Sequence, residues 1–196
     1  MSQTVEAVLE RAMRGDPAAF EEVVTLYERL VYNIAYRVLG NSEDAGDVTQ
    51  ESFVRLYKNI RSLEDVKHLK PWLCRVAHNL CIDELRRRKA RPSESLDAAH
   101  ELEDGAVSRQ LEDKTPGPEE AVLLKEELEQ LERAIAKLPD EYRVMIVMRD
   151  LSGLSYQEIS EATQLEMGTV KSRLSRARAR LREVFVREQS ELRIVK

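Results

Sequence analysis

The stretch that most constrains this chain is residues 167–182, MGTVKSRLSRARARLR, near the C-terminus. From Gly168 to Arg182 it holds six basic residues and no acidic one. Its apolar residues recur at the spacing of one helical face: Val170, Leu174, Ala177 and Leu181. We therefore expect an amphipathic helix that packs on a core by one side and presents cations on the other.

The opposite side of this predicted helix carries short hydroxyls and long cations. On a helical wheel its centre and shoulders hold Thr169, Lys171, Ser172, Arg173, Ser175, Arg176, Ala179 and Arg180. Such a face suits a DNA major groove, because cations neutralise phosphates while short polar tips reach base edges. A basic helix can equally be a solvated or partner-binding face, so the preceding residues decide between these interpretations.

Those preceding residues favour a DNA-binding motif. Ser155 and Glu158 have the spacing of a capping box, in which each side chain binds the other residue's backbone amide. Ile159 and Ala162 give the short helix an inward face, and residues 163–166 form a compact turn with Leu165 as its buried residue. A short helix, a tight turn and a longer basic helix predict a helix-turn-helix.

Composition indicates an all-helical protein. Of 196 residues, 34% are charged and 5% aromatic, with only seven glycines and six prolines. No apolar run has the length of a membrane span, and the N-terminus lacks signal-peptide architecture. We therefore expect a cytoplasmic protein, whose two cysteines remain thiols.

The net charge of −5 is unevenly distributed. Residues 92–120 hold nine acidic and two basic residues, a net charge of −7, which leaves the rest of the chain at +2. The acidity therefore belongs to one segment. Because residues 92–118 are also poor in apolar residues and end in Pro-Gly-Pro, they predict a flexible linker between an N-terminal domain, 1–91, and a C-terminal domain, 119–196.

The first half of the chain predicts four helices. Residues 4–14 form a short one, and Asp16-Pro17 starts a second that Gly40-Asn41 ends. Ser42 is the expected N-cap of a third helix, to about Asn59, with Ala45, Val48, Ser52, Phe53 and Leu56 inward and Asp44, Asp47, Gln50 and Glu51 outward. Gly46 weakens this helix by up to about 1 kcal/mol.

The fourth predicted helix follows a polar connection and runs from Trp72 to Lys89 after Pro71. One side groups Cys74, Ala77, His78, Cys81 and Leu85; the other groups Trp72, Arg75, Asn79, Asp83, Arg86 and Arg87. Five cations among residues 86–91 complement the helix dipole and also offer an electrostatic footprint for nucleic acid. An exposed Trp72 and Asn79 would add a stacking surface and a base-edge hydrogen bond.

Cys74, His78 and Cys81 share one helical face, so a zinc site is an alternative for that face. A fourth ligand would come from elsewhere, such as His68, whereas structural zinc usually draws its ligands from two elements. Buried small residues are the simpler interpretation.

In the second half, residues 119–137 predict a helix with Val122, Leu123, Leu128, Leu131 and Ile135 inward. Pro139 begins another, whose Tyr142, Val144, Met145, Ile146, Val147 and Met148 supply a small core. With the helix-turn-helix, this half has four helices. The predicted fold is all-α, with two small helical domains joined by an acidic linker.

Taken together, these blocks resemble the extracytoplasmic-function (group IV) sigma factors of bacterial RNA polymerase. The resemblance covers nearly the whole chain and depends on six blocks in order: residues 20–27, 44–53, 71–86, 138–143, 154–159 and 168–174. It implies a sigma region 2 domain, a linker through the polymerase RNA path, and a region 4 domain.

The resemblance also implies roles for particular residues. Asp44, Asp47, Gln50 and Glu51 would dock on the polymerase clamp helices. The helix 72–88 would melt and read the −10 element, with Asn79 and residues 60–70 capturing a flipped base. The C-terminal helix would read the −35 element, with Thr169, Ser172 and Arg176 at or near bases, Lys171 and Arg173 on phosphates, and Ser175 limited to short-range contact.

The expected function is thus a non-enzymatic, promoter-specific initiation factor, with core RNA polymerase, promoter DNA and an anti-sigma protein as partners. No cofactor, metal or small-molecule substrate is expected, since the three histidines fit no triad and no phosphate loop is present. The alternative is a stand-alone dimeric helix-turn-helix regulator whose N-terminal half is a sensor domain.

Overall fold

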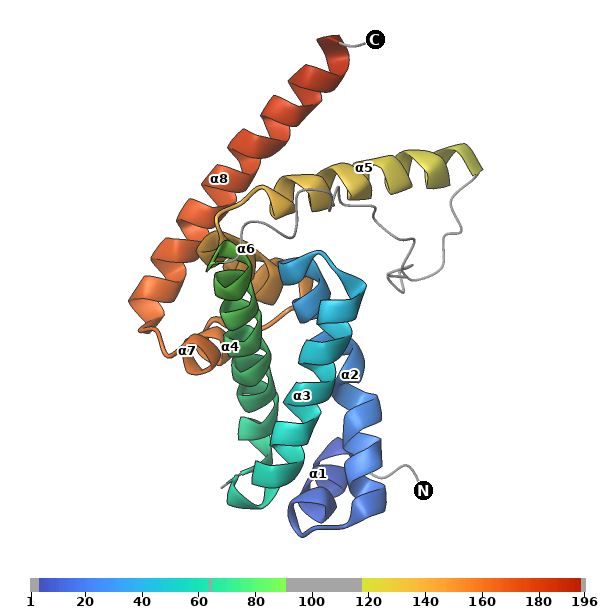
Figure 1. Cartoon of the computed structure of the whole chain (residues 1–196), viewed down its shortest axis with the longest axis vertical. Coiled ribbons are helices and arrows are strands. Elements are labelled where there is room, and N and C mark those ends of the chain that lie inside the picture. Colours follow the sequence, from blue (N-terminus) through green and yellow to red (C-terminus); the bar gives the residue numbers. More distant parts are fainter. Residues whose placement is uncertain (1–3, 64, 91–117, 195–196) are drawn as a thin grey trace.

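The structure, a computed structural model, describes residues 4–63, 65–90 and 118–194. Within these ranges every element is helical, as the sequence predicts, and Figure 1 shows the helices gathered around a common centre with α8 projecting from it. The predicted linker falls on residues outside the described ranges, except for Pro118, which begins a helix.

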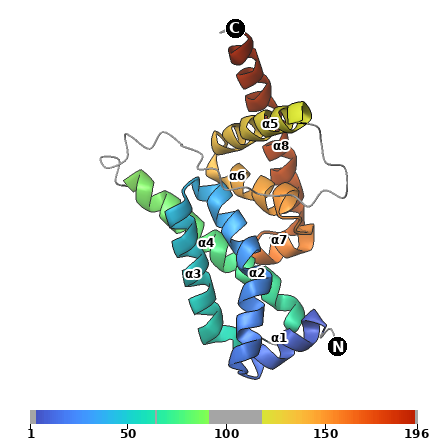
Figure 2. The ribbon, with the colours of Figure 1, turned by 90° about the vertical axis from the view of Figure 1, so that its right-hand side faces the viewer.

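The N-terminal half contains four α-helices and two short 3₁₀ turns: α1 (Val5–Met13), α2 (Pro17–Leu39), α3 (Ser42–Asn59), η1 (Ile60–Ser62), η2 (Val66–His68) and α4 (Leu69–Ala90). Figures 1 and 2 show α2, α3 and α4 packed side by side, with α1 across the end of α2. The predicted inward residues of α3 are all buried, which confirms that helical face.

The ends of these helices follow local chemistry. The Asp16 carboxylate accepts hydrogen bonds from the amides of Ala18 and Ala19, at 3.0 and 3.3 Å, so the predicted N-cap of α2 is confirmed. Gly40 ends α2 with φ +70°, a left-handed conformation that glycine adopts without a Cβ penalty.

Two predicted helix starts differ from the structure. The N-cap of α3 is Asn41, whose side-chain oxygen accepts from the Asp44 amide at 3.0 Å, whereas Ser42 is already helical. Helix α4 begins at Leu69, before Pro71. Proline is tolerated there because amides of the first turn have no partner within the helix.

The C-terminal half contains α5 (Pro118–Ala136), α6 (Asp140–Ile146), η3 (Val147–Leu151, a π-helical turn), α7 (Tyr156–Thr163) and α8 (Met167–Ile194). Its core holds the five predicted aliphatic residues Val144, Met145, Ile146, Val147 and Met148. Helix α8 continues twelve residues beyond the predicted stretch and extends past the other helices (Figure 2).

One predicted core residue is wrong. Leu128 of α5 is 52% exposed, whereas Ile135 is 3% exposed. Figure 1 shows that the N-terminal part of α5 extends away from the other helices. Because α5 reaches the core through its C-terminal turns, where Ile135 lies, an apolar period along the helix does not by itself bury Leu128. The side chains of Val122 and Leu123, which were also predicted to face inward, lie outside the described ones.

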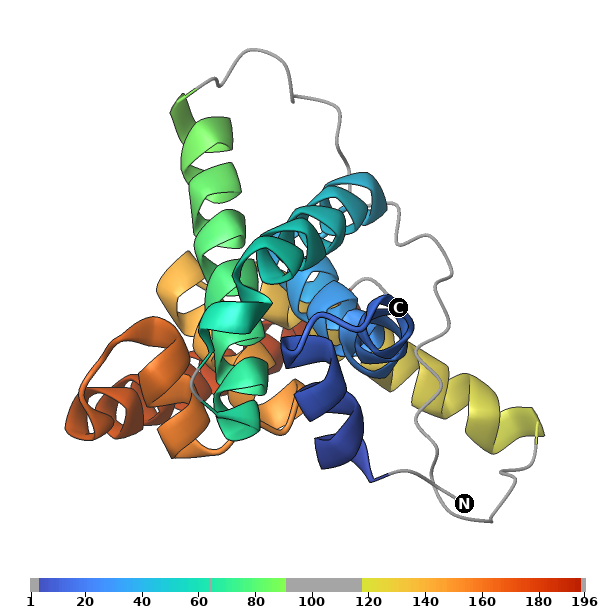
Figure 3. The ribbon, with the colours of Figure 1, turned by 90° about the horizontal axis from the view of Figure 1, so that it is seen from below.

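The two halves pack directly on each other. Helix α7 lies against α4, and α2 contacts α5, α6 and η3. Figure 3 shows the orange and red helices α7 and α8 beside α4, and the yellow α5 projecting past α2 on the opposite side. The buried side chains form one cluster that runs from Val8 to Ala177 and includes residues of both halves. Along the described ranges, no helix is both long and apolar enough to cross a bilayer.

Candidate nucleic-acid interface

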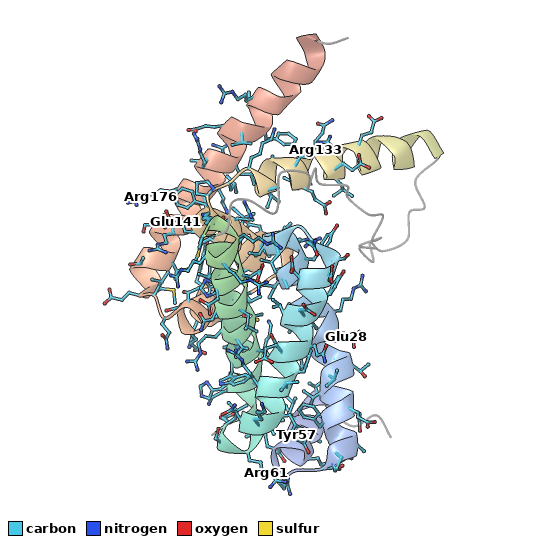
Figure 4. The ribbon with its side chains drawn as sticks, viewed as in Figure 1. Glu28, Tyr57, Arg61, Arg133, Glu141 and Arg176 are labelled. Atoms are coloured by element: carbon cyan, nitrogen blue, oxygen red, sulfur yellow. The ribbon has the colours of Figure 1, made fainter. Side chains whose placement is uncertain are left out.

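Helix α8 separates an apolar face from a polar one. Val170, Leu174 and Ala177 are at most 1% exposed, as the predicted wheel requires. The polar face carries the predicted contact residues: Lys171, Ser172, Ser175 and Arg176 are exposed, and Thr169 and Arg173 are half-buried. Figure 4 shows Arg176 pointing outward from α8.

The predicted helix-turn-helix is confirmed in its local chemistry. The Ser155 amide donates to the Glu158 carboxylate at 2.7 Å, and the Glu158 amide donates to the Ser155 hydroxyl at 3.1 Å. Both halves of the capping box are therefore present. The turn is made by Gln164, with φ +57°, and by the Ser160 hydroxyl, which donates to the carbonyl of Leu165 at 2.5 Å.

The cations of α8 have different partners. Arg178 donates to the Asp150 carboxylate through Nε at 3.0 Å and Nη2 at 2.5 Å, and this pair raises the pKa of the guanidinium. Arg173 lies 3.7 Å from a Glu141 oxygen. Within the described residues Lys171 and Arg176 make no ion pair, which leaves their charges available to an anion. Nothing in the sequence indicated the structural role of Arg178.

The predicted −10 face of α4 is largely accessible. Asn79, Asp83, Arg86 and Arg87 are exposed, and Arg75 is half-buried. Intrahelical pairs hold two of these arginines, with Arg87 2.7 Å from Glu84 and Arg86 3.7 Å from Asp83.

Trp72 differs from its predicted place as an exposed stacking surface. It is half-buried and packs against the core cluster. A helical wheel assigns each residue a direction but cannot show that a large ring in the first turn of α4 folds onto neighbouring apolar side chains. Only the accessible part of the indole ring could stack on a base.

The other face of α4 is buried. Cys74 and Cys81 are fully covered, and this burial raises the pKa of each thiol to about 12, so both remain neutral at physiological pH. Burial also lowers the pKa of His78, whose Nδ1 lies 3.2 Å from the Asn79 side-chain oxygen. Among the residues with described side chains, no three His, Cys, Asp or Glu groups converge on a possible metal position.

The outward residues of α3 divide into two kinds. Asp47 and Gln50 are exposed. Asp44 instead pairs with Arg88 of α4, which also donates to the carbonyl of Leu39 at 2.9 Å, and Glu51 pairs with Arg55 at 2.7 Å. Asp44 therefore ties α3 to α4.

Next to Gln50 lies a groove that sequence reasoning missed. Its volume is about 540 Å³, and it lies between α2 and α3. Its lining includes Val54 and Tyr57, which are 38% and 65% exposed, together with Phe20, Phe53 and Glu28. Figure 4 shows Glu28 and Tyr57 on this side of the molecule. The signal in the sequence was two apolar residues at outward positions of α3.

Comparison with known proteins gives the family. The pattern of sigma-70 region 2 matches residues 23–91, and that of sigma-70 region 4 matches residues 128–181. The chain is 36% identical over 184 residues to the ECF RNA polymerase sigma factor SigW of Bacillus subtilis, covering 93% of this chain and 97% of that protein.

The chain belongs to the extracytoplasmic-function sigma factors. It is also 35% identical over 179 residues to the sigma-E factor of Escherichia coli, covering 89% of this chain and 91% of that protein. The region 2 match extends from within α2 to the residue after α4, and the region 4 match from within α5 to the middle of α8. The family resemblance inferred from the sequence is confirmed.

Solved structures give the same fold. CnrH in complex with the cytosolic domain of CnrY aligns with a TM-score of 0.66 at 21% identity, over 93% of this chain and 97% of that one. The sigma factor RpoE of Bartonella quintana, in complex with the anti-sigma factor NepR, aligns with a TM-score of 0.62 at 24% identity, over 84% of this chain and 95% of that one.

Proposed function

We propose that this sigma factor binds core RNA polymerase, recognises the −35 and −10 elements of a promoter and assists promoter melting. The observation that carries the proposal is the presence of two separate polar, cationic faces, on α4 in the region 2 half and on α8 in the region 4 half. A single duplex reader needs only one of them. The sensor domain of the alternative regulator is not favoured, because the sequence of the N-terminal half matches region 2.

The face of α8 reads duplex DNA in this proposal. Arg176, Ser172 and Thr169 lie at or near base edges, while Lys171 and Arg173 neutralise phosphates and Ser175 makes only a short-range contact. The exposure of Arg176 and the absence of an ion-pair partner for it within the described residues support this assignment. Arg173 would exchange its 3.7 Å contact with Glu141 for a phosphate.

The face of α4 acts on the opened strand. Asn79 binds the flipped base together with the accessible edge of Trp72, and Arg75, Arg86 and Arg87 follow the backbone beside Asp83. Flipping a base costs a few kcal/mol, which stacking, hydrogen bonds and polymerase contacts must offset. The exposed positions of Asn79, Arg86 and Arg87 support this assignment.

Polymerase docking is assigned to α3. Of the four predicted docking residues, Asp47 and Gln50 are exposed, and the apolar groove beside them offers further contact area. Asp44 and Glu51 belong to the same proposed surface, although both are engaged within the chain. Such a factor catalyses no reaction itself and works in the cytoplasm, where polymerase is.

An inhibitory protein partner is also part of the proposal. The RpoE structure contains an anti-sigma factor, and an extracytoplasmic-function factor with two accessible nucleic-acid faces would need to be kept off promoters until it is required. The partner would cover one or both faces.

Run-off transcription with core polymerase tests the function. Genomic fragments are transcribed with core alone, with core plus the chain, and with core plus an Asn79→Ala variant, and the start sites are mapped. We expect new start sites that share two upstream elements and that weaken with the variant. Tight binding to a duplex operator without polymerase, combined with no new start sites, would instead support the stand-alone regulator.

A further inference from the structure

The segment expected to capture a flipped base, residues 60–70, carries four basic side chains: Arg61, Lys67, His68 and Lys70. A carboxylate lies beside three of them, with Lys67 Nζ 2.8 Å from Asp65, Lys70 Nζ 2.7 Å from Glu158 and His68 Nδ1 4.0 Å from Glu161. Arg61 makes no ion pair within the described residues. Its positive charge is therefore uncompensated in the part of the chain that the structure describes.

The start of this segment rests on α1. Helix α1 contacts both η1 and η2, the two short turns that carry Arg61 and His68. Ile60 is 3% exposed and Leu69 is fully buried, so side chains at both ends of the segment belong to the core. Figures 1 and 4 together show Arg61 at the end of the molecule where α1, α3 and the start of α4 meet.

Gly15, in the turn between α1 and α2, brings the backbone against the Arg61 side chain. A Cβ added at Gly15 would lie 2.9 Å from both Nε and Cζ of Arg61, which is closer than real Cβ atoms approach. Gly15 also has φ +92°, a conformation that L side chains rarely adopt. A residue with a side chain would therefore be strained in this turn and would displace the guanidinium of Arg61.

The guanidinium of Arg61 is thus placed by packing, although its charge stays accessible. Arg61 is an exposed residue. Asp16, which follows Gly15 in the chain, is already occupied, because Arg11 Nη2 lies 2.6 Å from its carboxylate and that carboxylate also caps α2. A side chain that is already ordered loses less entropy when it binds a ligand. Arg61 is therefore a pre-positioned cation at the edge of the proposed capture site.

We propose that Arg61, held in position by Gly15, binds a backbone phosphate of the opened strand beside the captured base. The inference deepens the proposed function and rests on it, because that function places a flipped base near Asn79 and gives Arg61 no role. A guanidinium fits this ligand, since its parallel N–H groups can donate to two phosphate oxygens at once. Phosphate contacts fix the register of a strand rather than its sequence. Arg61 thus determines which nucleotide reaches the capture site.

The test uses core polymerase with the chain and a forked promoter fragment taken from a start site mapped by run-off transcription. The fragment is double-stranded upstream, and its non-template strand is unpaired across the −10 element. The dissociation constant is measured over a range of salt concentrations for the unaltered chain, Arg61→Gln and Arg61→Lys. Arg14→Gln is the matched control, because Arg14 is exposed and precedes Gly15 but pairs with Glu10 at 3.0 Å.

The salt dependence separates a phosphate contact from a structural role. One phosphate contact to a single strand contributes about 0.7 to the slope of log affinity against log salt. We expect Arg61→Gln to lower the slope by about that amount and to weaken binding about 3- to 10-fold at low salt. Arg61→Lys should keep most of the slope but bind less tightly, because an ammonium cannot donate in two parallel bonds.

The control defines what would overturn the inference. Arg14→Gln should leave the slope nearly unchanged. Equal losses from Arg14→Gln and Arg61→Gln would show a general effect of net charge in place of a positioned contact. Binding by Arg61→Gln that matches the unaltered chain would refute the inference and leave the proposed function intact. Failure of the unaltered chain to direct polymerase to any promoter would refute the proposed function, and the inference with it.

Neutral methylphosphonates locate the contact. Each phosphate of the unpaired strand is replaced in turn, and binding is measured with the unaltered chain and with Arg61→Gln. We expect one position at which replacement weakens binding of the unaltered chain about 3- to 10-fold but has little further effect on Arg61→Gln, since residues in direct contact are not additive. Additive losses at every position would rule out a direct contact.

Gly15→Ala tests the positioning itself. The added Cβ should displace the guanidinium, so binding to the fork falls towards that of Arg61→Gln, and Gly15→Ala should add no further loss when Arg61→Gln is already present. Urea denaturation shows whether each variant is folded, and the Arg61 variants judge the phosphate contact without it. A loss from Gly15→Ala that persists in full beside Arg61→Gln would show that the turn acts independently of Arg61.

Discussion

Arg176 and Arg178 give a matched test of recognition by α8. They lie two residues apart on one helix, and both are arginines with exposed side chains. Arg178 is held by two hydrogen bonds to Asp150. Arg176 makes no ion pair within the described residues and points outward (Figure 4). Arg178 is therefore assigned a structural role, and Arg176 is assigned a role in DNA contact.

The expected magnitudes separate the two roles. An arginine that donates to a base edge contributes about 1–3 kcal/mol of discrimination, which is roughly 5- to 150-fold at one promoter position. Arg176→Ala should lose that discrimination while changing the free energy of unfolding by less than about 0.5 kcal/mol. Arg178→Ala should cost about 0.5–1 kcal/mol of stability, as a partly exposed two-bond pair does, and leave the order of promoter preference intact.

The assay is run-off transcription on promoters that carry every single substitution across the −35 element, together with urea denaturation of each variant. We expect the Arg176→Ala profile to flatten at one position. If Arg176→Ala weakened all promoters by the same factor, the contact would be to a phosphate. If it lowered stability as much as Arg178→Ala does, the division of α8 into a recognition face and a structural face would be wrong.

Three further predictions concern stability and reactivity. Gly46→Ala should raise the free energy of unfolding by about 0.5–1 kcal/mol in urea denaturation, because the added Cβ meets nothing within 4 Å in the middle of α3; a loss would show that the helix needs glycine there. Burial lowers the pKa of His78, so the folded state favours the neutral ring, and the free energy of unfolding should be at its full value above about pH 6.5 and fall on acidification. His78→Asn should flatten the pH dependence of stability measured between about pH 7.5 and 5.5, and an unchanged slope would assign that dependence to other groups. Cys74 and Cys81, with pKa values of about 12, should react with a disulfide reagent at pH 8 only as the chain unfolds; fast labelling of the native protein would contradict their burial.

Local chemistry explains which features could be predicted from the sequence. The Asp16 cap, the Ser155 capping box and the buried face of α8 all depend on residues within one or two turns of each other. Where two adjacent residues have similar capping ability, as Asn41 and Ser42 do, local rules do not decide between them, and the structure uses the first.

Contacts between distant residues could not be predicted. The sequence showed Asp44 as an outward carboxylate, but its pairing with Arg88 depends on how α3 packs on α4. Arg178 and Asp150 lie 28 residues apart and meet only after the helix-turn-helix has folded. The packing of α7 on α4 could not be predicted for the same reason, because an amphipathic pattern shows that a helix has a buried face but not which helix covers that face.

The division of α8 has an evolutionary consequence. The residues that hold the helix in place, Val170, Leu174 and Ala177, are buried, whereas Ser172, Ser175 and Arg176 are exposed. Exchange of an exposed residue changes stability little, so this surface can vary among descendants of the gene while the scaffold is preserved. A duplicated copy could thus acquire a new set of target genes through a few substitutions on one side of one helix.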